Sequence, residues 1–340
     1  MGLPSEAEWD FCKMKTIRDI NSYTSPAPCV ATIGFFDGVH LGHRHLINQV
    51  LDQAKRRGGM DTMAVTFATH PRQVVQPGFC PRLLTTTDEK LSLLATTGID
   101  FCALLPFDRQ MAAMSAHDFM RDVLLGRLGV RVLVTGYDNR FGHDRTEGFE
   151  QYAEYGRELG IEVIKATAFA PKGQNVSSSA IRRKVADGDM EGASLLLGRA
   201  YIVGGKVADG FKKGRELGFP TANIAVDDSQ KLIPPPGAYV VEVEVEGVED
   251  TFGGMMGIST RPTFGGTVTT LEVNIFGFSG DIYGRHATVK FIHRMRPEHK
   301  FDSEAQLISQ LKADRAEAMS LLEARRQPSL HSYNSHSSHN

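Results

Sequence analysis

Cysteine is scarce in this chain, and the cysteines that are present lie far apart. Its 340 residues include four of them, Cys12, Cys29, Cys80 and Cys102. Structural zinc sites need closely spaced ligand pairs, and small secreted proteins need a dense set of disulfides. Neither pattern is present, so the sequence favours a protein that works in a reducing compartment.

The sequence also lacks an excess of charge and any long hydrophobic run. Lys and Arg total 38 and Asp and Glu total 40, for a net charge of −2. This balance gives no general positive field for nucleic acid or anionic membranes, so local donors must bind any polyanionic substrate. No apolar run is long enough to span a membrane, and the N-terminus has neither signal-peptide nor myristoylation features. We therefore expect a cytoplasmic protein with no nucleic-acid or membrane partner.

The hydrophobic pattern divides the chain into two unlike halves. From about residue 29 to residue 183, apolar runs alternate with helical patterns, which predicts a parallel sheet covered on both faces. The expected strands there are residues 29–33, 63–67, 101–105, 130–134 and 161–164, and the expected helices are residues 88–97, 115–128 and 147–159. In such a sheet, ligands bind beyond the carboxyl ends of the strands.

Beyond residue 201, short alternating runs separated by Gly and Pro predict an antiparallel barrel or sandwich. A final helix follows, with Ser303 and Gln306 spaced as a capping box. The expected strands of this half are residues 201–207, 238–246, 252–258, 270–276 and 287–292.

The segment Gly34–His43 carries the strongest functional signal. It follows the strand 29–33 and leads into a helical pattern, an arrangement in which backbone N–H groups and the helix dipole bind phosphate. His40 and His43 are three residues apart, so both rings face one side of the helix start. Two imidazoles there are suited to stabilising charge on a phosphoryl oxygen. The segment favours nucleotidyl transfer from a nucleoside triphosphate.

Three other interpretations of this segment are weaker. A glycine-bearing turn is common in α/β proteins for packing alone. A zinc site built from His40, His43 and His45 lacks a fourth ligand nearby, and His45 lies on a different helix face. A dinucleotide fold or a phosphate-binding loop would need the patterns Gly-x-Gly-x-x-Gly or Gly-x-x-x-x-Gly-Lys-Ser/Thr, which are absent.

Two later segments carry further phosphate-binding residue types. Ser177–Lys184 places hydroxyls and then cations at an expected helix start; one serine is expected to cap the helix, and Arg182 suits triphosphate oxygens. Gly210–Asn223 combines three glycines with three cations. Thr221 and Asn223 there offer neutral oxygens for Mg²⁺ or phosphate, although an ordinary basic surface loop explains the segment equally well.

Glu272 shows the limit of periodicity. A glutamate in an alternating strand usually marks the solvated face, and Glu242, Glu244 and Glu246 are interpreted in that way. The alternation alone does not separate Glu272 from them.

Together these segments resemble the bifunctional riboflavin kinase/FMN adenylyltransferase family of prokaryotes, also called FAD synthetase. The resemblance extends from about residue 28 to residue 326. It rests on eight motifs in order: Gly34–His43, Phe67–Arg72, Gly136–Gly142, Ser177–Arg182, Gly210–Asn223, Arg261–Phe264, Leu271–Ile275 and Asp281–Gly284.

The resemblance implies a Rossmann-like α/β nucleotidyltransferase domain with a parallel sheet, followed by an antiparallel β-barrel domain with a C-terminal helix. The first would join FMN to AMP from ATP and release pyrophosphate, and the second would phosphorylate riboflavin with ATP and Mg²⁺. Riboflavin, FMN and FAD would be its substrates and products. The expected divisions are an N-terminal extension (1–25), the adenylyltransferase (26–186), the kinase (187–326) and a disordered tail (327–340).

The resemblance also implies roles for individual residues. His40 and His43 would be catalytic in adenylyl transfer, and Glu272 would be the catalytic base of the kinase. The adenylyltransferase would bind ATP through Gly34, Asp37, Ser178, Ser179 and Arg182 and flavin through Asp138 and Phe141; the kinase would bind ATP through Gly210, Gly214, Arg215, Gly218 and Pro220, with Thr221 and Asn223 on the metal.

These roles agree with the two reactions. The adenylyl acceptor is an ionised phosphate that needs positioning and charge stabilisation, whereas the kinase acceptor is an alcohol that must lose a proton. Asn139, Ala180, Ser259 and Asn274 depart from the usual pattern of the family, and none of them removes a proposed catalytic group.

Overall fold

The computed structural model describes residues 14–76, 78–137, 140–143, 146–171, 176–209, 218–226, 228–263 and 266–326. The chain forms two compact units. The first comprises Met1–Arg182 and Leu196–Gly198, and the second comprises Arg183–Leu195 and Arg199–Asn340. Among the described residues, no helix is both long enough and apolar enough to cross a membrane.

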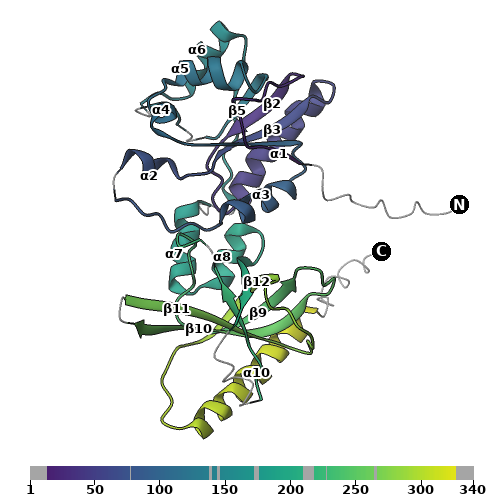
Figure 1. The fold of residues 1–340 in the computed structure, drawn as a ribbon. Coiled ribbons are helices and arrows are strands. Elements are labelled where there is room, and N and C mark those ends of the chain that lie inside the picture. The colour runs from purple at the N-terminus through teal and green to yellow at the C-terminus, as the bar shows by residue number, and fades with distance from the viewer. Residues whose placement is uncertain are drawn as a thin grey trace, which may run out of the picture. The chain divides into compact units, whose positions relative to one another are not determined.

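The first unit contains the expected parallel sheet (Figure 1). Across its described strands the order is β1-β4-β3-β2-β5-β6, and each neighbouring pair is parallel. Every residue of β2 is buried, as its continuous apolar sequence predicts for a strand covered on both sides. The strands are β1 (Lys15–Ile17), β2 (Cys29–Ile33), β3 (Asp61–Phe67), β4 (Phe101–Leu105), β5 (Val130–Thr135) and β6 (Glu162–Lys165).

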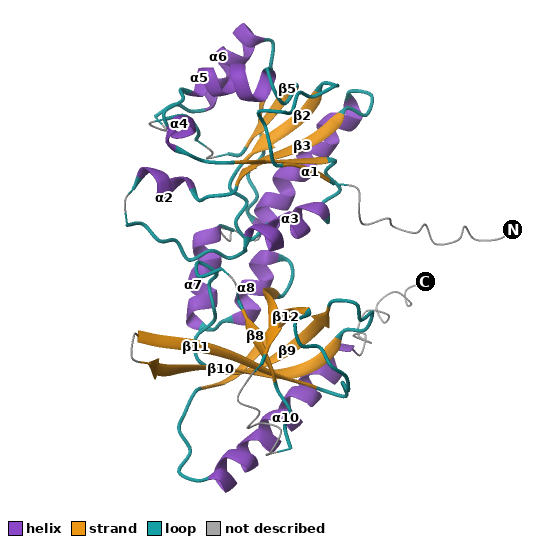
Figure 2. Cartoon of the chain, in the orientation of Figure 1, coloured by secondary structure: helices purple, strands orange, loops and turns teal. Residues whose placement is uncertain are grey.

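Helices cover both faces of this sheet (Figures 1 and 2). One face packs against α1, whose buried residues Leu46, Ile47 and Val50 recur at helical spacing. On the other face, Ala31 and Ile33 of β2 share a core cluster with residues of α5, η1 and α6. The helices are α1 (Leu41–Arg56), α2 (Pro71–Val75), α3 (Thr87–Ala95), α4 (Arg109–Ala112), α5 (Ala116–Asp118), the π-helix η1 (Phe119–Leu125) and α6 (Phe149–Leu159), with α7 (Ser178–Asp187) and α8 (Met190–Leu197) later in the chain.

Two features of the first unit differ from the sequence pattern. Strand β1 was not predicted because only three residues pair, and their pattern carries no alternation. It pairs with β4, so residues before position 26 form the edge of the sheet. The helix expected over residues 115–128 is present as α5 followed by the π-helix η1, whose wider turn hydrophobic spacing does not reveal.

The strand order places a topological switch point beside β2. From β2 the chain moves to β3 and then β4 on one side, and later returns to β5 on the other. The carboxyl ends of β2 and β5 are therefore adjacent, and ligands of α/β sheets bind at such a point. Gly34–His43 follows β2 and Gly136–Gly142 follows β5, so the two predicted motifs emerge at one edge.

The second unit is a closed antiparallel barrel (Figure 2). Its order is β10-β11-β8-β7-β12-β9, and α10 lies along β9 and β10. The expected Ser303 cap of α10 is present, since Ser303 Oγ accepts from Gln306 N at 3.3 Å. The reciprocal bond of the expected capping box is shifted by one residue, because Gln306 Oε1 accepts from Asp302 N at 3.1 Å. The elements are β7 (Tyr201–Ala208), β8 (Ala222–Ala225), β9 (Gly237–Val245), β10 (Phe252–Thr263), β11 (Gly266–Ile275), β12 (His286–Pro297) and α10 (Glu304–Arg326).

Strand β8 was not predicted, and it completes the barrel between β7 and β11. Its four residues are too few for a clear alternation, and they follow the glycine-rich segment. Gly205 permits the close approach of β7 to β8, because a Cβ there would lie 2.3 Å from the carbonyl oxygen of Ala225. Asn223 is therefore on a strand, with its backbone direction fixed by both neighbours.

Candidate active sites

The turn after β2 is strained and tightly held. Phe36 and Val39 have φ of 54° and 39°, in the left-handed region that non-glycine residues rarely adopt, and Gly38 has φ of 85°. Each such non-glycine residue costs about 1–3 kcal/mol, so it persists only where its surroundings fix it. Both side chains are fully buried. The backbone of this turn is therefore preorganised, as a site that positions phosphates requires.

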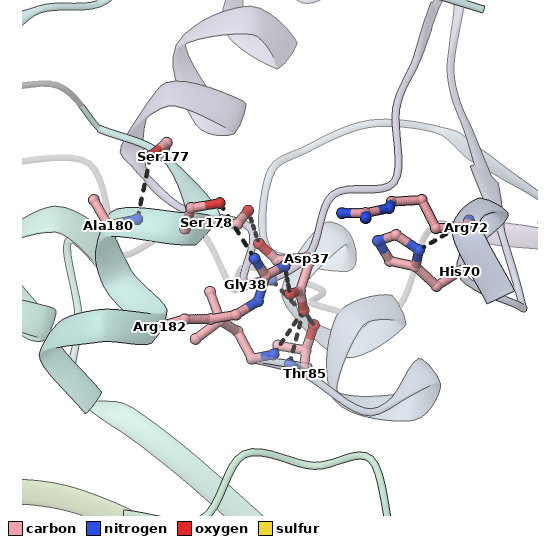
Figure 3. A network of polar contacts seen from close by, with 11 residues as sticks. Asp37, Gly38, His70, Arg72, Thr85, Ser177, Ser178, Ala180 and Arg182 are labelled. Atoms are coloured by element: carbon pink, nitrogen blue, oxygen red, sulfur yellow. Dashed lines mark hydrogen bonds and ion pairs between the residues drawn. The ribbon is translucent and has the colours of Figure 1, made fainter. Parts of the chain in front are cut away.

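Asp37 is the anchor of the turn (Figure 3). Its Oδ1 accepts from the backbone N–H of Leu84 (2.9 Å) and of Thr85 (3.1 Å) and from Thr85 Oγ1 (3.2 Å). Its Oδ2 forms an ion pair with Arg182 Nη2 at 2.7 Å. Only 2% of Asp37 is exposed. These contacts occupy both carboxylate oxygens, so in this conformation Asp37 holds Arg182 and the turn in place.

His40 and His43 form a stacked pair at the start of α1. Their ring centroids are 3.6 Å apart with an interplanar angle of 17°. The prediction that both rings face one side is confirmed. His40 is the N-cap, and its Nδ1 accepts from the backbone N–H of His43 at 3.3 Å. This acceptor role leaves the proton of the neutral His40 ring on Nε2.

The start of α7 contacts the same turn (Figure 3). Ser177 Oγ accepts from Ala180 N at 3.2 Å, so the expected serine cap is Ser177. Ser178 Oγ donates to the carbonyl oxygen of Asp37 at 2.9 Å. Arg182 follows one helical turn later and reaches the Asp37 carboxylate. The two predicted motifs are thus joined by direct hydrogen bonds.

Three adjoining cavities surround these residues. The apolar cavity, of about 450 Å³, is lined by Gly34 and by aromatic and methionine side chains that include Phe67, Phe107, Met114, Phe119 and Phe141. The polar cavity, of about 490 Å³, is lined by Asp37, His43, Ser177, Ser178, Ser179 and Arg182 among others. The third cavity, of about 560 Å³, is lined by His40, His43, His45, Gly136, Tyr137 and Phe169 among others.

The cavities share walls. Phe35, His70 and Arg72 line both the apolar and the polar cavity. His43 and two serines of the α7 start line both the polar and the third cavity. A ligand with a flat apolar part and a phosphate therefore has a place for each part, next to a further space beside the histidine pair.

Sequence reasoning assigned no role to His70 or Arg72, although both lie in the motif Phe67–Arg72. His70 is the N-cap of α2, and its Nδ1 accepts from Arg72 N at 3.2 Å. Burial, and next the charge of Arg182, lower the pKa of His70 to about 4. His70 is therefore neutral near pH 7, with its Nε2–H available as a donor at the wall between the cavities. The signal in the sequence was the capping pattern His-Pro-x-Gln.

The second unit has a separate cavity of about 300 Å³ between the barrel and α10. Glu272 on β11 and Asn223 on β8 are paired across the antiparallel strands. Paired residues point to the same face of a sheet, so the carboxylate and the amide are neighbours. Glu272, Asn274 and Thr221 line this cavity. Periodicity did not decide whether Glu272 lies on the solvated face of β11. The structure places it on the face that lines the cavity.

A buried ion pair, which the sequence did not reveal, fixes α10 to the barrel at this cavity. Arg296 of β12 donates to Asp314 of α10 through Nη2 (2.7 Å) and Nε (3.1 Å). Gln310 adds a third donor to this carboxylate at 2.7 Å. A bidentate pair of this kind sets the position of the helix that closes the cavity.

Comparisons with known proteins cover both units. A family model described as FAD synthetase matches residues 22–180, and one described as riboflavin kinase matches residues 197–322. A bifunctional riboflavin kinase/FMN adenylyltransferase from Escherichia coli (strain K12) is 37% identical over 304 residues, which cover 88% of this chain and 96% of that protein. The chain belongs to this bifunctional family.

Another member of this family and one solved structure match a similar share of this chain. The Bacillus subtilis (strain 168) protein of the same name is 31% identical over 315 residues, 90% of this chain and 98% of that one. The crystal structure of a macrolide-efflux protein from Streptococcus pneumoniae covers 90% of this chain and 99% of its own, with a TM-score of 0.81 and 30% identity. The name macrolide-efflux protein applies to the Streptococcus pneumoniae protein. Both family models that match this chain describe flavin enzymes.

The structure brings most of the expected site residues of this family member together. His40, His43, Ser178, Ser179 and Arg182 line the polar or third cavity. Gly34 and Phe141 line the apolar cavity. Gly218 has φ of 81°, which suits glycine, and Pro220 follows it at the entry to β8. Asp138, Gly210, Gly214 and Arg215 lie outside the described residues, as do Asn139, Phe264 and the tail 327–340.

Asn274, where the resemblance expects histidine, has a defined contact. It is 5% exposed, and its Nδ2 donates to the carbonyl oxygen of Pro220 at 2.6 Å. This bond holds the Pro220–Thr221 step beside Glu272. The substitution Asn274→Ala should raise the KM of the kinase for Mg–ATP about fivefold, the factor given by about 1 kcal/mol for one lost hydrogen bond.

The measurement is an ATP titration of FMN formation at saturating riboflavin and Mg²⁺. A rise in the KM for riboflavin with no change for ATP would show that Asn274 acts on the flavin instead. Adenylylation of added FMN serves as the control, because its site lies in the other unit.

Proposed function

We propose that this chain makes FAD from riboflavin in two ATP-dependent steps, one in each unit. The barrel phosphorylates riboflavin to FMN, and the α/β unit joins FMN to the AMP part of ATP and releases pyrophosphate. The observation that carries the proposal is the difference between the two sites. One has stacked imidazoles at a preorganised turn, and the other has a carboxylate paired with Asn223.

In the adenylyl step, the acceptor is a phosphate that is already ionised. The apolar cavity takes the flavin ring, and the polar cavity takes the phosphates, with His70 and Arg72 between them. An FMN phosphate oxygen attacks the α-phosphorus of ATP, and the bond to the β-phosphate oxygen breaks. Donors at His43, Ser179 and Arg182 stabilise the charge that develops there, and the fixed turn holds the phosphates in line.

In the kinase step, the acceptor is the terminal hydroxyl of the ribityl chain. Glu272 accepts its proton as the oxygen attacks the γ-phosphorus of ATP, and ADP leaves. The cavity under α10 takes the flavin, next to the Met255 and Ile258 side chains.

Thr221 and Asn223 would hold Mg²⁺ with ATP. Their hydroxyl and amide oxygens are the neutral oxygen ligands that Mg²⁺ accepts, and both lie beside Glu272. Among the described residues, no three His, Cys, Asp or Glu side chains form a group that would hold a metal alone. A cation delivered with ATP needs only one or two protein ligands, so the residues present fit it. When bound, Mg²⁺ neutralises charge on the phosphates.

A timed assay of the purified protein with riboflavin, ATP and Mg²⁺ tests the proposal, with flavins separated by chromatography. We expect FMN first, followed by FAD and pyrophosphate. FMN that accumulates and is not adenylylated even when added would contradict the role of the α/β unit. Conversion of added FMN to FAD with riboflavin untouched would contradict the role of the barrel.

A further inference from the structure

Lys90 of α3 is a buried charge for which neither the motifs nor the comparisons give a role. It is 3% exposed. Its Nζ donates to the carbonyl oxygen of Phe67 at 2.7 Å and lies 4.4 Å from the ring centroid of Phe35. Within the part of the chain that the structure describes, no carboxylate lies within ion-pair distance of it. A buried ammonium without a counter-ion is costly, and a methionine would fill the same space without that cost.

Both contacts of Lys90 are residues that line the adenylyl site. Phe67 ends β3 and lines the apolar cavity, and Phe35 lines both the apolar and the polar cavity. The Phe35 ring in turn meets His70 edge-on, with centroids 4.6 Å apart. The chain of contacts from Lys90 therefore ends at the wall between the two cavities. A cation over an aromatic face attracts the ring more strongly when water is excluded, which favours one position of the ring.

We propose that Lys90 is a positioning residue for adenylyl transfer, whose charged ammonium holds Phe35, and through it His70, at the boundary between flavin and phosphate. This inference rests on the proposed function, because that boundary has this meaning only if FMN spans the two cavities. Loss of the charge releases the ring, and the FMN phosphate then meets the ATP α-phosphorus out of line. The effect falls on kcat for FAD formation more than on the KM for ATP.

The charge also provides a pH signature. Burial lowers the pKa of Lys90 to about 8. The groups that face it are Cys102 of β4, Asp37 of the turn and His70 at the α2 N-cap. Burial raises the pKa of Cys102 to about 12, and His70 is neutral above about pH 4, so neither titrates near pH 8. FAD formation should therefore decline as the pH rises through 8, while the ammonium deprotonates.

The experiment compares wild type, Lys90→Met and Lys90→Arg, with Lys55→Met as the matched change at an exposed lysine of the same unit. We expect Lys90→Met to lower kcat for adenylylation of added FMN by about 10–100-fold. Riboflavin phosphorylation by the same protein should be unchanged, because it takes place in the other unit. A KM for ATP close to wild type in the adenylylation reaction shows that the α/β unit of the variant is folded. Lys90→Arg should retain most of the rate, and its decline near pH 8 should disappear because guanidinium stays charged.

Several outcomes would overturn the inference. One is a Lys90→Met variant with the kcat of wild type. Another is the absence of a decline near pH 8 in the rate at which wild-type protein forms FAD. This test needs no variant, so it holds even if Lys90→Met does not fold. A third is a Lys90→Arg variant that keeps the decline. Wild-type protein that makes no FAD from FMN would instead refute the proposed function.

Discussion

Replacing Glu272 with glutamine should slow FMN formation by about 10²–10⁴-fold, the usual contribution of a general base. The amide has the same shape but does not accept the hydroxyl proton, so the γ-phosphoryl transfer loses its base. Glu272 lies on the cavity side of β11, paired with Asn223. The variant should still convert added FMN to FAD, because adenylyl transfer takes place in the other unit. Initial rates of both reactions, measured on one preparation, provide the test.

The matched control is Glu242→Gln on β9. Glu242 is also a glutamate in an alternating strand, between the buried Val241 and Val243. The cavity under α10 is not lined by it. Its replacement should leave both rates close to wild type. If Glu272→Gln also kept the wild-type kinase rate, Glu272 would be an ordinary solvated glutamate and the base would have to be sought elsewhere.

The second large effect is expected at the histidine pair. His43→Ala should slow FAD formation by about 10²–10³-fold, the cost of one lost donor to a developing negative charge. Alanine is a good helix former, so α1 should keep its first turn. FMN formation should persist at the wild-type rate. The measurement is the rate of adenylylation of added FMN, monitored through the pyrophosphate that the reaction releases.

His117→Ala is the control for this variant, since His117 is a histidine of the same unit that pairs with Glu158 away from the three cavities. A fall of both activities in His43→Ala with the fold intact would contradict separate sites. A loss of FAD formation in both histidine variants would point to a general effect on the unit rather than to the stacked pair.

Much of the fold was predictable because its strands are buried. The apolar run 29–33 is β2 residue for residue, and the apolar runs 101–105 and 130–134 correspond to β4 and β5. Burial on both faces forces such runs, so they are visible without a structure. Strands β1 and β8 escaped prediction because short strands at an edge or beside a loop carry no period. The register that places Asn223 opposite Glu272 leaves no local pattern in the sequence, so it could not be predicted.

The site residues were predictable where a motif places them close together in the chain, as with His40 and His43. Long-range contacts were not. The hydrogen bonds of Asp37 to Thr85 and Arg182, and the pair Arg296–Asp314, join segments whose approach depends on the whole fold. Lys90 carries no local signal either, because a lysine on a helix is normally solvated.

The contacts of Asp37 also determine when during synthesis the adenylyl site is complete. Ser178 and Arg182 reach back to Asp37 across 141 and 145 residues of chain. Nascent chains lengthen from the N-terminus, and contacts of such separation form late. While α7 is still inside the ribosome, Asp37 is in place without Arg182, and the wall of the polar cavity that Ser178 and Arg182 form is missing. Under the proposed function, nucleotide binding therefore reports the moment at which the first unit is finished.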